Sequence, residues 1–188
     1  ATGYFPVRYP GITESGAWLR SLAAAVLFFA SVLLHELGHS VMALRHGIEI
    51  RSITLFIFGG VARLGHDPED GRTELKVAIA GPLVSVALGA VFYVSSALPF
   101  LSEAVASVAR YLAFINVAIA MFNLVPAFPL DGGRLLRGFL WTFAGKGRAT
   151  RIAASAGIAF GYVLVGGGLL ALFTGHGLTG LWYVLIGW

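Results

Sequence analysis

The sequence SVLLHELGHSVMAL, residues 31–44, decides the fold, because it places two imidazoles and a carboxylate inside an apolar run. The run extends back to Trp18, so it is long enough for a helix that crosses the hydrocarbon core of a bilayer, which takes about 20 residues. Ionisable side chains at that depth are costly and usually mark a functional site. His35, Glu36 and His39 are therefore the first candidates for chemistry.

The composition of the whole chain is that of a membrane protein. Of its 188 residues, 57% are hydrophobic and 12% are charged, and the mean hydropathy is +0.83, unlike an ordinary soluble domain. The sequence predicts an all-α polytopic membrane protein, a bundle of about five transmembrane helices. The apolar windows that we expect to span are residues 18–44, 76–98, 104–124 and 152–173, with a fifth beginning near Leu178.

The chain is interpreted as a single membrane domain, residues 1–188, because it contains neither a repeat nor a low-complexity tract. It begins at Ala1 with a polar connector, and it ends at Trp188 within the fifth apolar window. We therefore expect a fragment of a longer protein. The absence of cysteine excludes disulfides, thiolate zinc sites and cysteine nucleophiles from this part of it.

The basic residues cluster in two of the predicted loops, which argues against a nucleic-acid partner. One group lies between the first and second windows and the other between the third and fourth: Arg45, Arg51, Arg63, Arg72 and Lys76, and Arg134, Arg137, Lys146, Arg148 and Arg151. Loops rich in Lys and Arg face the cytoplasm. The first window is thus predicted to run inward, with its ionisable residues below the surface and nearer the cytoplasmic side.

The motif HELGH has the spacing of a zinc site. On a helix, His35 and His39 lie one turn apart on one face and can hold a single ion. Glu36 follows at about 100° around the helix, where it can take a proton from a metal-bound water. A chance match on an ordinary helix is the alternative, and the cost of burying three ionisable groups in lipid argues against it.

A catalytic zinc usually takes a third protein ligand, and Asp131 is the candidate. It lies in FNLVPAFPLDGGRLLRGFL, residues 122–140, where Pro126 and Pro129 must break an apolar helix. Broken backbone at membrane depth is tolerated only where it is buried or lines a wet cavity. Gly132 and Gly133 permit close backbone approach behind it. The alternative role for Asp131 is as the N-cap of the following helix.

Asn123, one turn before Pro126, is a second polar residue in this region. It either helps to bind the developing oxyanion of a scissile carbonyl or hydrogen-bonds a neighbouring helix. The remaining histidines lie in predicted loops and are interpreted as solvated surface residues: His46, His66 and His176. Gly81-Pro82 and Gly166 to Gly168 are interpreted as helix-packing and kink positions without a catalytic role.

With these motifs the chain resembles the site-2 protease family of intramembrane zinc metalloproteases. The family pattern is HExxH in one transmembrane helix and Asn-x-x-Pro followed by Asp-Gly at the end of another, which here read HELGH at 35–39 and NLVPAFPLDGG at 123–133. GGVARL at 59–64 and AGP at 80–82 are further similarities. The likeness therefore covers most of the chain.

The resemblance implies an intramembrane zinc endopeptidase that cleaves membrane-spanning proteins. It implies Zn²⁺ bound by His35, His39 and Asp131, with Glu36 as general base. It also implies a sixth helix before the HExxH helix in the full-length protein and cytoplasmic regulatory domains beyond Trp188. The expected partners are the transmembrane helix of a substrate and the lipid bilayer, with no nucleic acid and no prediction of oligomeric state.

Residues 50–64, IRSITLFIFGGVARL, are rich in β-branched and aromatic residues in partial alternation. We expect a small membrane-dipping β-hairpin that accepts an unwound substrate as an extra strand, or a simple re-entrant loop.

Two other functions remain open for the whole chain. An intramembrane metal or proton transporter also uses buried ionisable residues, and a catalytically inactive relative would act as a membrane receptor.

Overall fold

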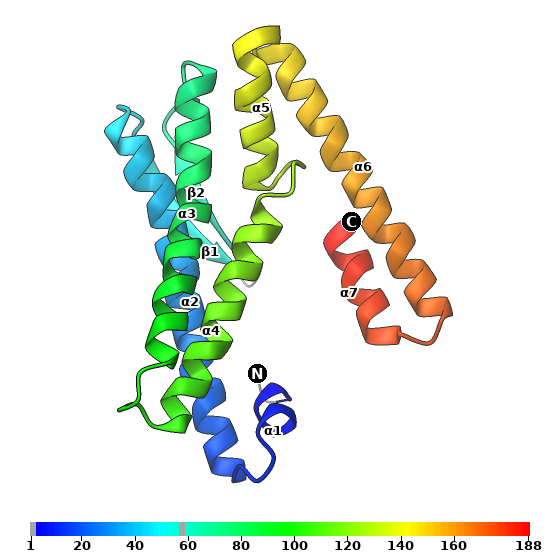
Figure 1. Ribbon diagram of the computed structural model, residues 1–188. Helices are drawn as coiled ribbons and strands as arrows, with labels where there is room; N and C mark the ends of the chain where they lie inside the picture. Colours follow the sequence, from blue (N-terminus) through cyan, green and yellow to red (C-terminus); the bar gives the residue numbers. More distant parts are fainter. Residues whose placement is uncertain (1–2, 57–58) are drawn as a thin grey trace. The chain divides into compact units, whose positions relative to one another are not determined.

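The computed structural model describes residues 3–56 and 59–188 of the chain (Figure 1). The chain forms two compact units, residues 1–67 with 79–122 and residues 68–78 with 123–188. The elements in chain order are α1 (Tyr4–Arg8), α2 (Glu14–Arg45), β1 (Ile50–Phe56), β2 (Gly59–Leu64), α3 (Gly71–Ser96), α4 (Glu103–Asn123), α5 (Asp131–Ala144), α6 (Lys146–Phe173) and α7 (Gly177–Gly187). The helix α3 contributes its first turns to the second unit and the remainder to the first.

The helix α2 carries the HELGH motif and has clear signals at both ends. Thr13 is its N-cap, and the Thr13 hydroxyl accepts a hydrogen bond of 3.2 Å from the Gly16 N–H. Glu14 in the first turn and Arg45 in the last complement the helix dipole. The chain leaves the helix at Gly47, whose φ of 76° suits glycine. The 32 residues of α2 make it about 48 Å long.

Four helices of the described chain are long and apolar enough to cross a membrane: α2, α3, α4 and α6. They confirm the first four predicted windows and a multi-pass integral membrane protein. The fifth window forms α7, which has only 11 residues and is too short to span. It begins at Gly177, next to the predicted start at Leu178, and extends to Gly187, one residue before the last residue of the sequence. The predicted count of five is therefore not confirmed.

Small residues let the helices of the first unit approach closely. A Cβ at Gly38 of α2 would lie 2.8 Å from the Val84 side chain of α3, and one at Gly89 of α3 would lie 3.0 Å from Val117 of α4. Close approach through small residues is how helices pack in lipid, where apolar burial gives little driving force. The three helices α2, α3 and α4 therefore pack through glycine contacts.

Polar and aromatic contacts complete this unit. The Asn116 amide of α4 donates to the Ser31 hydroxyl of α2 at 3.2 Å and to its own helix at the Leu112 carbonyl. Toward the N-terminal end of α2 lies an apolar cluster in which α1 takes part. Its buried members are Phe5, Ala24, Val108 and Leu112, with Tyr9, Ile12, Phe28, Phe92 and Tyr111 packed around them.

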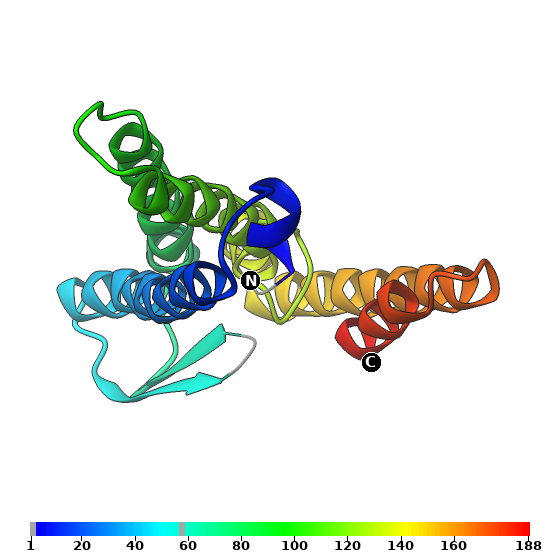
Figure 2. The same cartoon turned by 90° about the horizontal axis from the view of Figure 1, so that it is seen from below.

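The strands β1 and β2 form a two-stranded antiparallel sheet that contacts α2 (Figure 2). Its register pairs Phe56 with Gly59 and Ile50 with Leu64, and it is irregular between Ile50 and Ser52. The two residues that connect the strands, 57 and 58, lie outside the described residues. The hairpin or re-entrant loop expected at 50–64 and its depth in the membrane therefore stay predictions.

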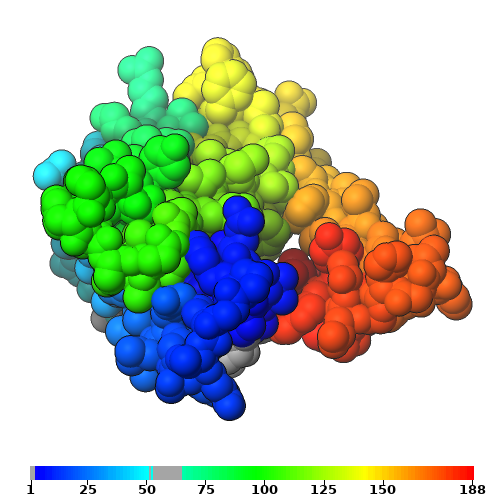
Figure 3. Space-filling model, turned by 60° about the horizontal axis from the view of Figure 1, so that its bottom comes forward, coloured from blue at the N-terminus to red at the C-terminus, as the bar shows by residue number. Residues whose placement is uncertain are grey.

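The second unit is built from α5, α6, α7 and the first turns of α3. The helix α7 packs along α6 (Figures 1 and 3) through paired glycines, since a Cβ at Gly168 would lie 2.7 Å from the Gly180 carbonyl oxygen. Gly145, with φ of 79°, joins α5 to α6. Gly71 of α3 and Gly138 of α5 touch backbone to backbone, and a Cβ at Gly138 would lie 2.9 Å from the Gly71 carbonyl oxygen.

The helix α3 begins at a carboxylate cap. Asp70 Oδ1 accepts hydrogen bonds from the N–H groups of Arg72 at 2.7 Å and Thr73 at 2.9 Å, and Oδ2 accepts one from the Thr73 hydroxyl at 2.8 Å. These hydrogen bonds to Thr73 are the main cause that lowers the pKa of Asp70 below its usual value. The ionised cap therefore stabilises the start of the helix.

We expect Asp70→Ala to lower the thermal unfolding midpoint at pH 7, because the first-turn N–H groups lose their acceptor. A lowered folded-state pKa contributes stability above the unfolded value, and that contribution is lost as the pH falls through the folded pKa. The difference between wild type and variant should thus shrink as the pH falls below the ordinary aspartate pKa of about 4. Asp70→Asn, which keeps an acceptor, is the control. A difference that does not change with pH would contradict the role of the ionised cap.

Candidate metal centre

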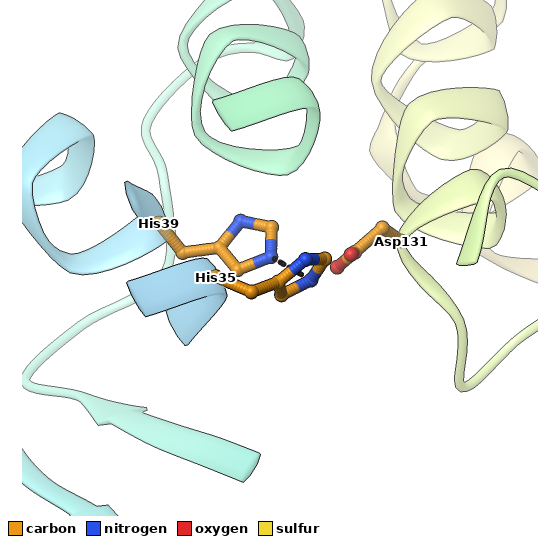
Figure 4. Close-up of side chains that lie close together, drawn as sticks. All are labelled: His35, His39 and Asp131. Atoms are coloured by element: carbon orange, nitrogen blue, oxygen red, sulfur yellow. Dashed lines mark hydrogen bonds between the residues drawn. The ribbon is translucent and has the colours of Figure 1, made fainter. Parts of the chain in front are cut away.

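The two histidines of HELGH face each other inside α2. Both are buried, and Nε2 of His35 lies 3.2 Å from Nε2 of His39, with the rings nearly perpendicular (Figure 4). Two nitrogen ligands at 2.0–2.1 Å from a tetrahedral zinc would be about 3.3 Å apart. The separation of the two nitrogens therefore fits a single ion.

Ser85 of α3 fixes one of these rings. Its hydroxyl lies 2.8 Å from Nδ1 of His35, and the serine is fully buried. When Nδ1 carries the proton and donates it to the Ser85 oxygen, Nε2 keeps its lone pair for a metal. Ser85 is not among the site residues predicted from the sequence. Its only signal was a serine in an apolar window, which does not reveal the partner.

Gly81 of α3 makes room for the pair. A Cβ at this position would lie 2.6 Å from Nε2 of His35 and would also clash with Nε2 of His39. The interpretation of Gly81 as a helix-packing position is therefore incomplete. The absent side chain leaves space at the two nitrogens that would face an ion. Any larger residue would fill that space.

Glu36 is buried on α2, 9% exposed, and follows His35 directly in the helix. A carboxylate buried in a spanning helix is costly and usually marks a functional site. Because Glu36 lies beside two imidazoles, it is a candidate for proton transfer.

Asn123 is the last residue of α4 and is half-buried. Its amide offers both a donor and an acceptor.

Asp131 is the first residue of α5. The alternative that it caps this helix is wrong, because the N-cap is Leu130 and the cap makes no side-chain hydrogen bond. The close backbone approach predicted for the two glycines that follow is confirmed. A Cβ at Gly133 would lie 2.6 Å from the Ala127 carbonyl carbon, and one at Gly132 would clash with the Leu124 and Val125 carbonyls. The connector after α4 is thus folded tightly against the start of α5.

Among the residues that the structure describes, one group of His, Asp and Glu side chains could hold a metal ion. It consists of His35, His39 and Asp131, each offering one ligand atom, and these atoms lie within 4.8 Å of one another (Figure 4). Two of the other histidines make hydrogen bonds outside this group. His46 hydrogen-bonds the Met42 carbonyl oxygen at the end of α2, and His66 hydrogen-bonds the Asp67 carbonyl oxygen.

Comparison with known proteins identifies the family. Residues 23–101 and 99–164 match the sequence profile of peptidase family M50. The chain belongs to peptidase family M50. The resemblance to the site-2 protease family is confirmed by a solved structure, the site-2 protease from Methanocaldococcus jannaschii. It aligns with a TM-score of 0.68 and 32% identity over 99% of this chain and 82% of that one.

Relatives of this M50 chain include proteins named as zinc metalloproteases. It is 39% identical over 185 residues to the Synechocystis protein sll0528, named provisionally as one, covering 96% of this chain and 48% of that protein. Zinc metalloprotease MJ0392 of Methanocaldococcus jannaschii is 40% identical over 147 residues, covering 78% and 43%. The chain therefore spans about half the length of these M50 relatives.

We expect Ser85→Ala to weaken zinc retention by about 10- to 100-fold, the usual cost of losing an outer partner of a metal-ligating histidine. The measurement is competition with a chelator of known affinity on purified protein. Ser107→Ala is the matched control, because Ser107 is an equally buried serine whose hydroxyl donates within its own helix. Equal zinc retention in both variants would exclude an orienting role for Ser85.

Proposed function

We propose that this chain is the catalytic part of an intramembrane zinc endopeptidase that cleaves membrane-spanning proteins. The observation that carries the proposal is the His35–His39 pair, buried in a helix long enough to span lipid and facing nitrogen to nitrogen at 3.2 Å. Membership of the M50 family and relatives named as zinc metalloproteases support it. They favour a protease over the transporter or receptor alternatives.

We assign the zinc ligands as His35, His39 and Asp131. Two imidazole nitrogens and one carboxylate oxygen form a donor set typical of catalytic zinc, which leaves a fourth position for water or substrate. When bound there, zinc supplies a Lewis acid that makes water acidic enough to lose a proton near neutral pH. Ser85 keeps the His35 ring in the orientation that such a ligand needs.

Glu36 is assigned as the general base. Its carboxylate takes a proton from the attacking water and later gives that proton to the leaving amine of the cleaved peptide bond. The Asn123 side-chain N–H is assigned to the developing oxyanion of the scissile carbonyl. In this scheme no residue other than Glu36 carries the transferred proton.

We propose that the site lies nearer the cytoplasmic side, and the distribution of basic residues supports this. Arg45 ends α2, and it begins the first of the two basic loops, which should face the cytoplasm. His39 lies about 9 Å along the helix from Arg45. Water would therefore reach the site from the cytoplasm over a short distance.

The substrate is a transmembrane helix that must be locally unwound, because helical backbone in lipid has its amide groups bonded internally. We propose that the sheet of β1 and β2, next to α2, dips into the membrane and accepts the unwound segment as an added strand. Support comes from the antiparallel pairing of β1 with β2 and from their contacts with α2.

We expect Glu36→Gln to retain zinc and fold but to lower cleavage by at least about 100-fold, because the amide cannot accept the proton. The assay is cleavage of a panel of single-span proteins by purified enzyme, with metal content measured in the same samples. Glu103→Gln, at an exposed carboxylate, is the control. Undiminished cleavage by the Glu36 variant would overturn the proposed mechanism, and zinc flux into liposomes without cleavage would favour a transporter.

We expect Asp131→Ala to lower zinc affinity by more than the 10- to 100-fold loss typical of an outer-partner change, because a direct ligand is removed. Chelator competition measures this affinity, and thermal unfolding of the metal-free protein shows whether the fold persists. Asp131→Asn, which keeps the shape but loses the charge, should fall between wild type and Asp131→Ala. Normal zinc content in Asp131→Ala would remove this residue from the ligand set.

A further inference from the structure

A buried ion pair in the second unit has no part in the mechanism above. Glu74, in the first turn of α3, is fully buried. Both of its carboxylate oxygens accept from Nε of Arg137 on α5, at 2.8 and 2.9 Å, and Arg137 Nη2 also pairs with Oε1. Arg134 Nε lies 3.9 Å from the same carboxylate. The guanidinium of Arg137 therefore ties α5 to α3 through several contacts.

The same guanidinium also contacts the connector that leads into Asp131. The Arg137 Cζ atom lies 5.3 Å from the centroid of the Phe128 ring, a cation–π distance. Phe128 stands three residues before Asp131 and Arg137 six residues after it. Arg137 therefore links two segments. It contacts α3 through the Glu74 carboxylate and the connector before Asp131 through the Phe128 ring.

Backbone contacts tighten this arrangement further. Gly138, next to Arg137, packs against α3, where a Cβ would lie 3.0 Å from the Leu75 side chain. Gly157 of α6 packs against the connector, where a Cβ would clash with the Phe128 carbonyl oxygen. Both glycines leave no room for a side chain. The connector and the first turns of α5 are therefore held by α3 on one side and α6 on the other.

Stability alone gives a weak reason for such a pair. Replacing a buried ion pair by apolar residues of similar volume is often neutral or stabilising, because the charges no longer have to be desolvated. A planar guanidinium that bonds both carboxylate oxygens instead fixes direction, which a flexible ammonium does not. Metal ligands must be held within about half an ångström of their productive geometry. Such a pair is suited to that task.

We propose that Glu74 and Arg137 are positioning residues that hold the Asp131 carboxylate in its metal-binding orientation. The inference rests on the proposed role of Asp131 as a ligand. The pair acts through the start of α5 and touches neither metal nor substrate. The helix α3 carries both Ser85, which contacts His35 in the first unit, and Glu74, which contacts Arg137 in the second.

The test uses the double variant Glu74→Met/Arg137→Met, which removes both charges of the pair together and leaves only Arg134, whose side chain is 23% exposed, without this carboxylate. We expect the metal-free double variant to unfold at the wild-type temperature but to bind zinc about 10- to 100-fold more weakly. Substitution by Co²⁺ supplies a readout besides activity, because its visible bands report ligand number and geometry. These bands should weaken and shift in the double variant.

Arg137→Lys keeps the charge but loses the bidentate contact with the Glu74 carboxylate, and we expect it to lower zinc affinity as well. Arg110→Lys is the matched control, since Arg110 pairs with Glu103 at an exposed site and should leave zinc affinity and the Co²⁺ spectrum unchanged. Wild-type affinity and spectrum in the double variant would overturn the inference. A loss of affinity confined to variants whose metal-free unfolding midpoint also falls would overturn it too.

Asp131→Ala in the same experiment separates the two proposals. If it loses zinc while the double variant does not, the ligand assignment stands and only the positioning role fails. If Asp131→Ala binds zinc as tightly as wild type, the ligand assignment fails and the positioning role fails with it.

Discussion

The structure depends on the need to give every ionisable side chain within a lipid-spanning helix a polar partner. A histidine or carboxylate at that depth has no bulk water to solvate it, so its partners must come from the protein or from a bound ion. The Nε2 atoms of His35 and His39 face one another at 3.2 Å, where an ion could partner both, and Ser85 supplies a protein partner for His35. Because α2 and α3 must lie close enough for that hydrogen bond, this requirement also fixes how the two helices pack.

Glycine meets the steric side of the same requirement. Gly38 brings α2 against α3, and Gly81 leaves the space that the two imidazoles occupy. In the second unit, Gly132 and Gly133 let the connector fold against the start of α5. In each case a methyl group would separate backbones or side chains that the polar contacts require to be close. The polar contacts of this protein therefore depend on its small residues.

The sequence predicted what depends on local pattern. Four spanning windows followed from hydropathy, and the facing imidazoles followed from the four-residue spacing of His35 and His39, since helical geometry alone sets that distance. The start of α7 at Gly177 agrees with the apolar window that was predicted to begin near Leu178. Ser85 and the Glu74–Arg137 pair were missed because the partners are 50 and 63 residues apart in the chain. Leu130, rather than Asp131, proved to be the cap of α5, which composition did not indicate.

The length of α2 links this protein to the thickness of its membrane. At about 48 Å the helix exceeds a hydrocarbon core of about 30 Å, so it must tilt from the bilayer normal or project beyond it. The histidine pair is fixed to that helix, nearer its C-terminal end. A thinner or thicker bilayer would change the tilt, and with it the depth at which the two imidazoles meet water. Lipid chain length is thus a physical variable that acts directly on this centre.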